Sequence, residues 1–125
     1  MLLPVYRLTR TKDFEILFTE GHFVGAKFLT AKCWKIDPAK WPRRNFAITD
    51  LKIGFLVSKK VDKRAVVRNR LKRQTREIVR LLLKDNKIKT GVLLGFMLKP
   101  EAKTAEYQDL EKDILFILKR FDLLV

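Results

Sequence analysis

Residues 58–80 decide the fold of this chain, and they read SKKVDKRAVVRNRLKRQTREIVR. From Lys59 to Arg80 the stretch contains ten lysines and arginines against two acidic residues, and this excess makes up more than half of the chain's net charge of +14. The apolar residues recur at helical spacing, which predicts a long helix within residues 65–83. Its apolar stripe consists of Val67, Leu71, Ile78 and Leu82.

The basic residues of this helix lie mostly off that stripe. At about 100° per residue, a sector about 140° wide that begins at Arg68 contains Asn69, Lys72, Arg73, Arg76 and Arg80. Guanidinium groups pair bidentately with phosphate, and an asparagine side chain can hydrogen-bond a sugar or a base edge. A helix that is merely solvated usually interleaves acidic residues. The pattern therefore predicts a helix that packs with one face and binds a polyanion with the other.

The segments around this helix predict further elements. A first helix is expected over residues 11–20, with Thr11 as its cap and Gly21 ending it. A strand is expected over 27–36, an exposed loop over 37–51 in which 46–48 extend a strand, and a strand over 52–58. After the long helix come a strand over 91–98 and a last helix that starts near Thr104. The order α-β-β-α-β-α predicts an α+β sandwich and leaves the order of the strands open.

Alternation assigns the side chains of the strands to two faces. Leu29, Ala31 and Cys33 should point one way, and Phe28, Thr30, Lys32 and Trp34 the other. In the next strand, Ile53, Phe55 and Val57 should oppose Gly54, Leu56 and Ser58. In the last helix, the residues expected to be buried are Tyr107, Leu110, Ile114, Ile117 and Phe121.

Composition limits the class of protein. The 125 residues, 47% hydrophobic and 34% charged, are expected to form one domain, residues 1–125, with a packed core. A net charge of +14 favours a polyanionic partner, nucleic acid before an anionic membrane, and no apolar run approaches the ~20 residues that span a bilayer. Cys33 is the only cysteine, which excludes an internal disulfide and fits a cytoplasmic protein.

Four short segments carry a family resemblance. The run Ser58-Lys59-Lys60, followed by RAVVRNRLKR at 64–73, resembles the signature of the bacterial ribonuclease P protein family, which has an Arg-Asn-Arg segment on its long helix. Asp13-Phe14 with Phe18 and Gly21 resembles the family's first helix, and Lys99-Pro100 the end of its last strand. The resemblance covers about residues 7–121. Three features depart from the family pattern: residues 61–64 replace a common glycine turn, Leu98 stands where a basic residue is frequent, and the 37–51 loop is long.

The resemblance implies a fold and a division of labour. The fold would be a single-domain α-β sandwich of order α-β-β-β-α-β-α, related to the second domain of a ribosomal small-subunit protein, with a left-handed β-α-β crossover. This order has one strand more than the pattern predicts. The additional strand would be either the start of the 37–51 region or one half of the first predicted strand, if that strand is divided into two. An RNA subunit with its own Mg²⁺ ions would remove the 5′ leader of precursor tRNA. The protein, expected to be monomeric, would contribute no catalytic residue, metal or cofactor.

The resemblance also implies two sets of RNA-contacting residues. The set that binds the catalytic RNA would be Lys59, Arg64, Arg68, Asn69, Arg70, Lys72, Arg73 and Arg76. A cleft between the first helix, the sheet and the start of the long helix would hold the single-stranded leader of precursor tRNA. It would be lined by Phe14, Phe18 and Lys60 with Arg68 and Asn69, and also by Thr30, Lys32, Leu56 and Ser58. Phe14 and Phe18 could equally be core residues.

Other classes of protein remain open at this point. A protein-only nuclease needs clustered carboxylates, and the chain offers only Asp50-Leu51-Lys52 and Asp85-Asn86-Lys87, with His22 expected in a loop. A general RNA-binding or ribosomal protein would share the basic helix without needing aromatic residues in a cleft. A DNA-binding helix-turn-helix is disfavoured because no short helix precedes the basic helix at the right distance.

Overall fold

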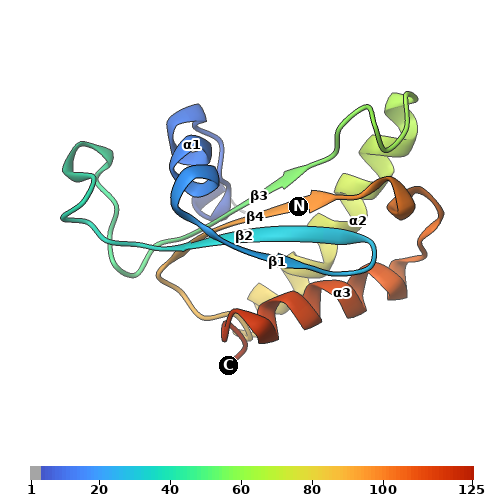
Figure 1. Cartoon of the computed structure of the whole chain (residues 1–125). Coiled ribbons are helices and arrows are strands. Elements are labelled where there is room, and N and C mark those ends of the chain that lie inside the picture. Colours follow the sequence, from blue (N-terminus) through green and yellow to red (C-terminus); the bar gives the residue numbers. More distant parts are fainter. Residues whose placement is uncertain (1–3) are drawn as a thin grey trace.

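A four-stranded sheet separates one short helix from two long ones (Figure 1). The computed structural model describes residues 4–125. The helices are α1 (Thr11–Glu20), α2 (Ala65–Lys84) and α3 (Tyr107–Arg120), and the strands are β1 (His22–Gly25), β2 (Leu29–Lys35), β3 (Leu51–Leu56) and β4 (Val92–Leu98). Short 3₁₀ helices occupy Pro4–Tyr6, Pro42–Arg44 and Pro100–Thr104. The order α-β-β-β-α-β-α confirms the expected α+β sandwich.

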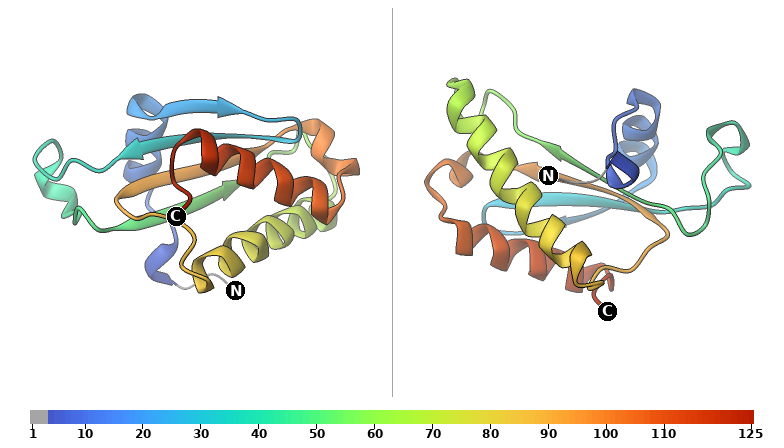
Figure 2. Two further views of the ribbon diagram at one scale, coloured as in Figure 1. Left: turned by 90° about the horizontal axis from the view of Figure 1, so that it is seen from below. Right: turned by 180° about the vertical axis from the view of Figure 1, so that it is seen from behind.

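The strands lie in the order β1-β2-β4-β3. The pairs β1–β2 and β2–β4 are antiparallel, whereas β3 and β4 are parallel and α2 connects them. Figure 2 (left) shows α2 and α3 in front of the sheet, with β4 on the side of β3 that makes this crossover left-handed. This is the hand that the family resemblance implied and that general topology rules disfavour.

The core has two parts, one on each face of the sheet. The larger part lies under α2 and α3, where Leu71, Ile78, Leu110 and Ile114 pack against Phe96 and the predicted inward face of β2. The smaller part lies under α1 and contains Leu8, Ile16, Leu17, Trp34, Ile36, Phe46 and Leu93. Of the five residues predicted to be buried in α3, Tyr107 and Phe121 are only partly buried.

The strand that the pattern missed is β1. It lies before β2, and not in the 37–51 region or within a split first strand. It has only four residues, mostly exposed, and pairs as an edge strand with His22 opposite Cys33 and Gly25 opposite Thr30. His22 is therefore a strand residue and not the predicted loop residue. Residues 46–48 form no strand, which corrects the prediction that they extend one. Phe46 is instead buried against Trp34, with ring centroids 5.6 Å apart.

Two predicted helix caps were also wrong. Thr11 was predicted to cap α1, but it is the first residue of the helix. Arg10 occupies the cap position, and no side chain caps this end. The last helix starts at Tyr107, because Glu106 and Asp109 form a capping box there. Thr104 instead donates its hydroxyl hydrogen to the Glu101 carbonyl oxygen, at 3.1 Å, within the preceding 3₁₀ helix. The predicted stop at Gly21 is confirmed, since α1 ends at Glu20 and the Gly21 backbone N–H caps it by donating to the Leu17 carbonyl oxygen. An added Cβ at Gly21 would lie 2.4 Å from that oxygen.

Candidate nucleic-acid interface

The outer side of α2 presents cations that have no partner among residues 4–125. Leu71, Thr75, Ile78 and Val79 form the buried side of the helix. Among the side chains of residues 4–125, those of Asn69, Lys72, Arg73 and Arg76 make no hydrogen bond or ion pair with one another or with the rest of the protein. We call these four residues the helix surface. Their unused donors are available to phosphate oxygens, and Asn69 offers both a donor and an acceptor.

Three other predicted RNA-binding arginines have partners within the protein. Arg68 donates through Nη1 to the carbonyl oxygens of Asp62, at 3.0 Å, and Lys63, at 2.8 Å. Arg64 forms an ion pair with Asp62 at 3.0 Å, and this hydrogen-bonded contact lowers the pKa of the Asp62 carboxyl to about 2. Arg70 donates to the Lys103 carbonyl oxygen at 3.0 Å, while its Nε is buried without a partner. These arginines hold α2 to the 59–64 turn and to the 3₁₀ helix after β4.

A second candidate surface is the part of the sheet that α1 does not cover. The register aligns Thr30, Met97 and Leu56 across β2, β4 and β3. Phe18 and Leu56 are each 36% exposed. Lys32 donates from Nζ to the Phe18 carbonyl oxygen at 2.6 Å and lies 6.0 Å from the centroid of the Phe18 ring. We call these five residues the open sheet face; it brings together four of the predicted leader-binding residues and adds Met97.

Phe14 lies on α1 beside this face, and two glycines set its place. An added Cβ at Gly54 would lie 2.7 Å from the Phe14 ring, and one at Gly95 would lie 2.8 Å from Leu17. These glycines therefore let α1 approach the sheet closely. Phe14 stacks on Phe18 with ring centroids 6.2 Å apart and is partly buried, so it does contribute to the core.

A cavity of about 290 Å³ lies next to the Phe14 ring. It is lined by Arg7, Leu8, Thr9, Phe14, Ile53, Gly54, Phe55 and Arg76. Of the residues assigned from the sequence to leader binding, only Phe14 lines it, whereas Arg76 comes from the helix surface. The pattern gave no signal for Arg7, because its proximity to β3 arises from a bridge between Arg7 and Ile53.

The turn before α2 carries the remaining predicted residues. Ser58 Oγ accepts a hydrogen bond from the Lys60 backbone N–H at 3.3 Å, so it shapes the turn. The side chains of Lys59 and Lys60 are exposed and have no partner among the described residues. Figure 1 shows this turn rising at the end of the sheet away from α1.

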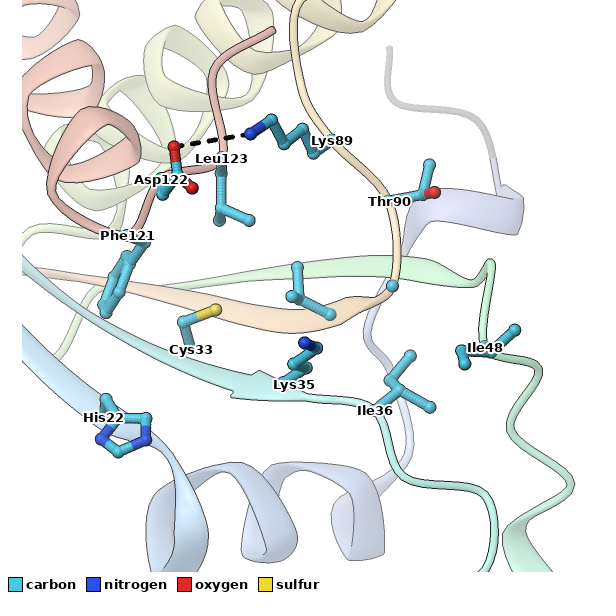
Figure 3. A pocket seen from close by; sticks show the side chains of 12 residues that line it. His22, Cys33, Lys35, Ile36, Ile48, Lys89, Thr90, Phe121, Asp122 and Leu123 are labelled. Carbon is cyan, nitrogen blue, oxygen red and sulfur yellow. Dashed lines mark hydrogen bonds and ion pairs between the residues drawn. The ribbon is translucent and has the colours of Figure 1, made fainter.

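A larger cavity of about 390 Å³ lies apart from both candidate surfaces (Figure 3). Its lining includes His22, Cys33 and Lys35 and an ion pair between Lys89 and Asp122 at 3.4 Å, but none of the residues predicted to bind RNA. Cys33 is buried, as predicted, and this burial raises the pKa of its thiol to about 12.

Residues 4–125 contain no cluster of three or more His, Cys, Asp or Glu side chains arranged to hold a metal ion. Within the same range, every helix is too short or too polar to cross a bilayer.

Comparison with known proteins decides the family. The family model described as Ribonuclease P matches residues 2–122. The chain belongs to the ribonuclease P protein family. The ribonuclease P protein component of Clostridioides difficile is 39% identical to it over 116 residues, which cover 93% of this chain and 91% of that protein. The ribonuclease P protein component from a Cyanothece species is 31% identical over 137 residues, which cover 99% of this chain and 98% of that protein.

Solved structures agree on the fold. The ribonuclease P protein of Staphylococcus aureus superposes with a TM-score of 0.76 at 22% identity, covering 96% of this chain and 98% of that one. The ribonuclease P protein of Thermotoga maritima, in complex with 1-(4-fluorophenyl)-2-thiourea, gives a TM-score of 0.71 at 22% identity, with coverage of 91% and 98%. As a ribonuclease P protein, this chain is a non-catalytic subunit of an endoribonuclease, and the general RNA-binding alternative is not favoured.

Proposed function

We propose that this ribonuclease P protein binds two RNAs with two surfaces. The helix surface, with Lys59 and the remaining donors of Arg64, Arg68 and Arg70, binds the catalytic RNA. The open sheet face, with Phe14, Ser58 and Lys60, binds the single-stranded 5′ leader of precursor tRNA. Magnesium ions held by the RNA activate the water that cleaves the leader, and no residue of the protein takes part in that step. The chain acts in the cytoplasm as a monomeric domain of residues 1–125.

The observation that carries this proposal is that the cations of the helix surface and the exposed aromatic surface lie on different elements, although Arg76 also lines the cavity next to Phe14. Cations without partners gather on the outer side of α2, where they can replace counterions along an RNA backbone. Phe18 and Leu56 are exposed on a different element and face, with Lys32 beside the Phe18 ring. A base can stack on an aromatic ring whatever its identity, and that suits a leader of variable sequence.

The experiment measures how tightly the assembled enzyme binds precursor tRNA and mature tRNA, which has no leader. Phe18→Ala should weaken precursor binding, because one stacked base typically contributes ~1–3 kcal/mol. Lys60→Ala should weaken it too, because a cation that contacts phosphate is lost. Affinity for mature tRNA and for the catalytic RNA should barely change. Phe116→Ala is the matched control, since Phe116 is 49% exposed but lies on α3, across the sheet from α1.

Thermal melting shows whether each variant is folded. If folded Phe18→Ala and Lys60→Ala proteins lost affinity for precursor and mature tRNA equally, the assignment of the leader to the open sheet face would be wrong. Sequencing the RNA that co-purifies with the native protein tests the other half of the proposal. One abundant structured RNA is expected, and a mixture of ribosomal RNAs would contradict it.

A further inference from the structure

The loop of residues 37–50 holds α1 at both of its ends. At the first turn, Asp13 Oδ1 accepts a hydrogen bond from Arg44 Nε at 2.9 Å and forms an ion pair with Arg44 Nη2 at 2.8 Å. Asp13 is only 5% exposed and, with Thr75, is one of two buried polar residues among those described. A buried carboxylate is costly without a partner, so this contact ties the loop firmly to the helix.

The same loop contacts the last turn of α1. Trp41 donates from Nε1 to Glu20 Oε2 at 2.8 Å, and Lys40 forms an ion pair with the same carboxylate. The hydrogen bonds from Lys40 and Trp41 lower the pKa of Glu20. Lys12 Nζ lies 5.3 Å from the centroid of the Trp41 ring, which adds a contact between the first turn of α1 and the loop. The loop therefore contacts α1 at Asp13 and Glu20, which are seven positions apart and lie on one side of the helix.

That side is not the side that carries the phenylalanines. At about 100° per residue, Asp13 and Glu20 lie close together around the axis of α1, and Phe14 and Phe18 lie on the flank turned away from Glu20. Figure 1 shows the loop beyond α1 at one end of the sheet, with the uncovered part of the sheet on the other side of the helix. The loop is also anchored beneath α1, because Phe46 packs on Trp34 of β2.

We propose that Asp13, Glu20, Trp41 and Arg44 are positioning residues for leader binding. They fix where α1 stands over the sheet, and α1 in turn fixes the distance of the Phe14 and Phe18 rings from the open sheet face. A helix of ten residues has little stability of its own, so its place depends on such contacts. This inference rests on the proposed leader-binding function and extends it to a loop that itself lies outside the open sheet face.

The sign of a charge effect separates positioning from direct electrostatics. Asp13→Asn and Glu20→Gln each remove one negative charge, so simple attraction of RNA would be unchanged or stronger. Positioning requires the opposite result. Each variant should weaken the binding of precursor tRNA by the assembled enzyme about five-fold, the lower end of what one stacked base contributes. Mature tRNA should bind as before, and KM for the precursor should rise while kcat stays unchanged.

A third acid on the same helix supplies the control. Glu15 is exposed, and its ion pair is with Lys12 of its own helix, at 3.8 Å. Glu15→Gln should leave precursor binding unchanged. Trp41→Phe keeps a ring in place but removes the N–H donor to Glu20, and it should reproduce the effect of Glu20→Gln.

The outcomes distinguish this inference from the function on which it rests. If Asp13→Asn and Glu20→Gln behave like Glu15→Gln while Phe18→Ala weakens precursor binding, the positioning role is wrong and the leader assignment stands. If Phe18→Ala also has no effect, the leader assignment itself fails, and the positioning role with it. Should Asp13→Asn melt below the assay temperature, folded Glu20→Gln and Trp41→Phe decide the question, and normal precursor affinity in both overturns the proposal.

Discussion

Replacing Arg73 with alanine tests the helix surface most directly. Arg73 is exposed on α2 and has no side-chain partner among residues 4–125, so its loss should leave the fold intact. One lost phosphate contact lowers the slope of log K against log salt by about 0.9. At a salt concentration of about 0.1 M, that slope corresponds to a loss of about eight-fold in affinity for the catalytic RNA, or about 1.2 kcal/mol.

The assay is a titration of labelled catalytic RNA with protein at a series of monovalent salt concentrations and constant magnesium. Arg120→Ala is the matched control, because Arg120 is an exposed arginine at the end of α3 and its removal changes the net charge by the same amount. Only Arg73→Ala should reduce the slope. A slope equal to that of the parent protein, or an equal reduction in Arg120→Ala, would refute the assignment of α2 as the docking surface.

Three further results are expected. Protein freed of RNA should not cut precursor tRNA at any magnesium concentration, and with the catalytic RNA it should raise cleavage most at low magnesium, because its cations offset phosphate repulsion; specific cleavage by the protein alone would contradict this. Gly54→Ala should cost about 1–3 kcal/mol in a melting experiment, because its Cβ would meet the Phe14 ring at 2.7 Å. Cys33 should react with thiol reagents at pH 8 only as fast as the protein opens, since burial raises the pKa of its thiol to about 12; labelling at the rate of a free thiol would show that Cys33 is not buried.

The helices were predictable because each carries apolar residues at helical spacing, a local pattern in its own sequence. The predicted 11–20 helix matches α1, and the predicted 65–83 helix differs from α2 by one residue. The edge strand β1 was not predictable in this way. Its four residues have no apolar alternation, and they become a strand only by pairing with residues 30–33 of β2. Strand order likewise depends on contacts between distant segments.

The features of the candidate site also divide into those that were predictable from one segment and those that depend on contacts between distant segments. Alternation placed Thr30 and Lys32 together on one face of their strand and Leu56 on one face of the next, because this property is local to each strand. Only the register across β2, β4 and β3 brings the three residues to a common face. Contacts with Asp13 and Glu20 were invisible, since Arg44 and Trp41 lie 31 and 21 residues away along the chain. The resemblance to known ribonuclease P proteins offered no help there, because the 37–51 loop is one of the features in which this chain departs from them.

The turn at residues 61–64 shows how this chain replaces a common family feature. A positive φ is one reason for a backbone position to require glycine, and among the described residues positive φ values occur at Asn45, Asn86, Gly91 and Asp122, none of which is in this turn. The turn therefore accepts ordinary residues. Val61 is 2% exposed and anchors the turn in the core, Asp62 holds Arg64, and Arg68 binds two carbonyl oxygens of the turn.

This arrangement assigns two tasks to the arginines of α2. A helical wheel counts Arg68 with Arg73 and Arg76, because it records only the direction in which a side chain leaves the helix. The structure separates them, since Arg68 donates hydrogen bonds to the turn, whereas Arg73 and Arg76 have no partner among residues 4–125. Arg64 and Arg68, which bind groups of the turn, fix the start of α2 and thereby the positions of Arg73 and Arg76. Replacing Arg68 would therefore change RNA binding partly through the turn, which is why Arg73 is the cleaner probe of the helix surface.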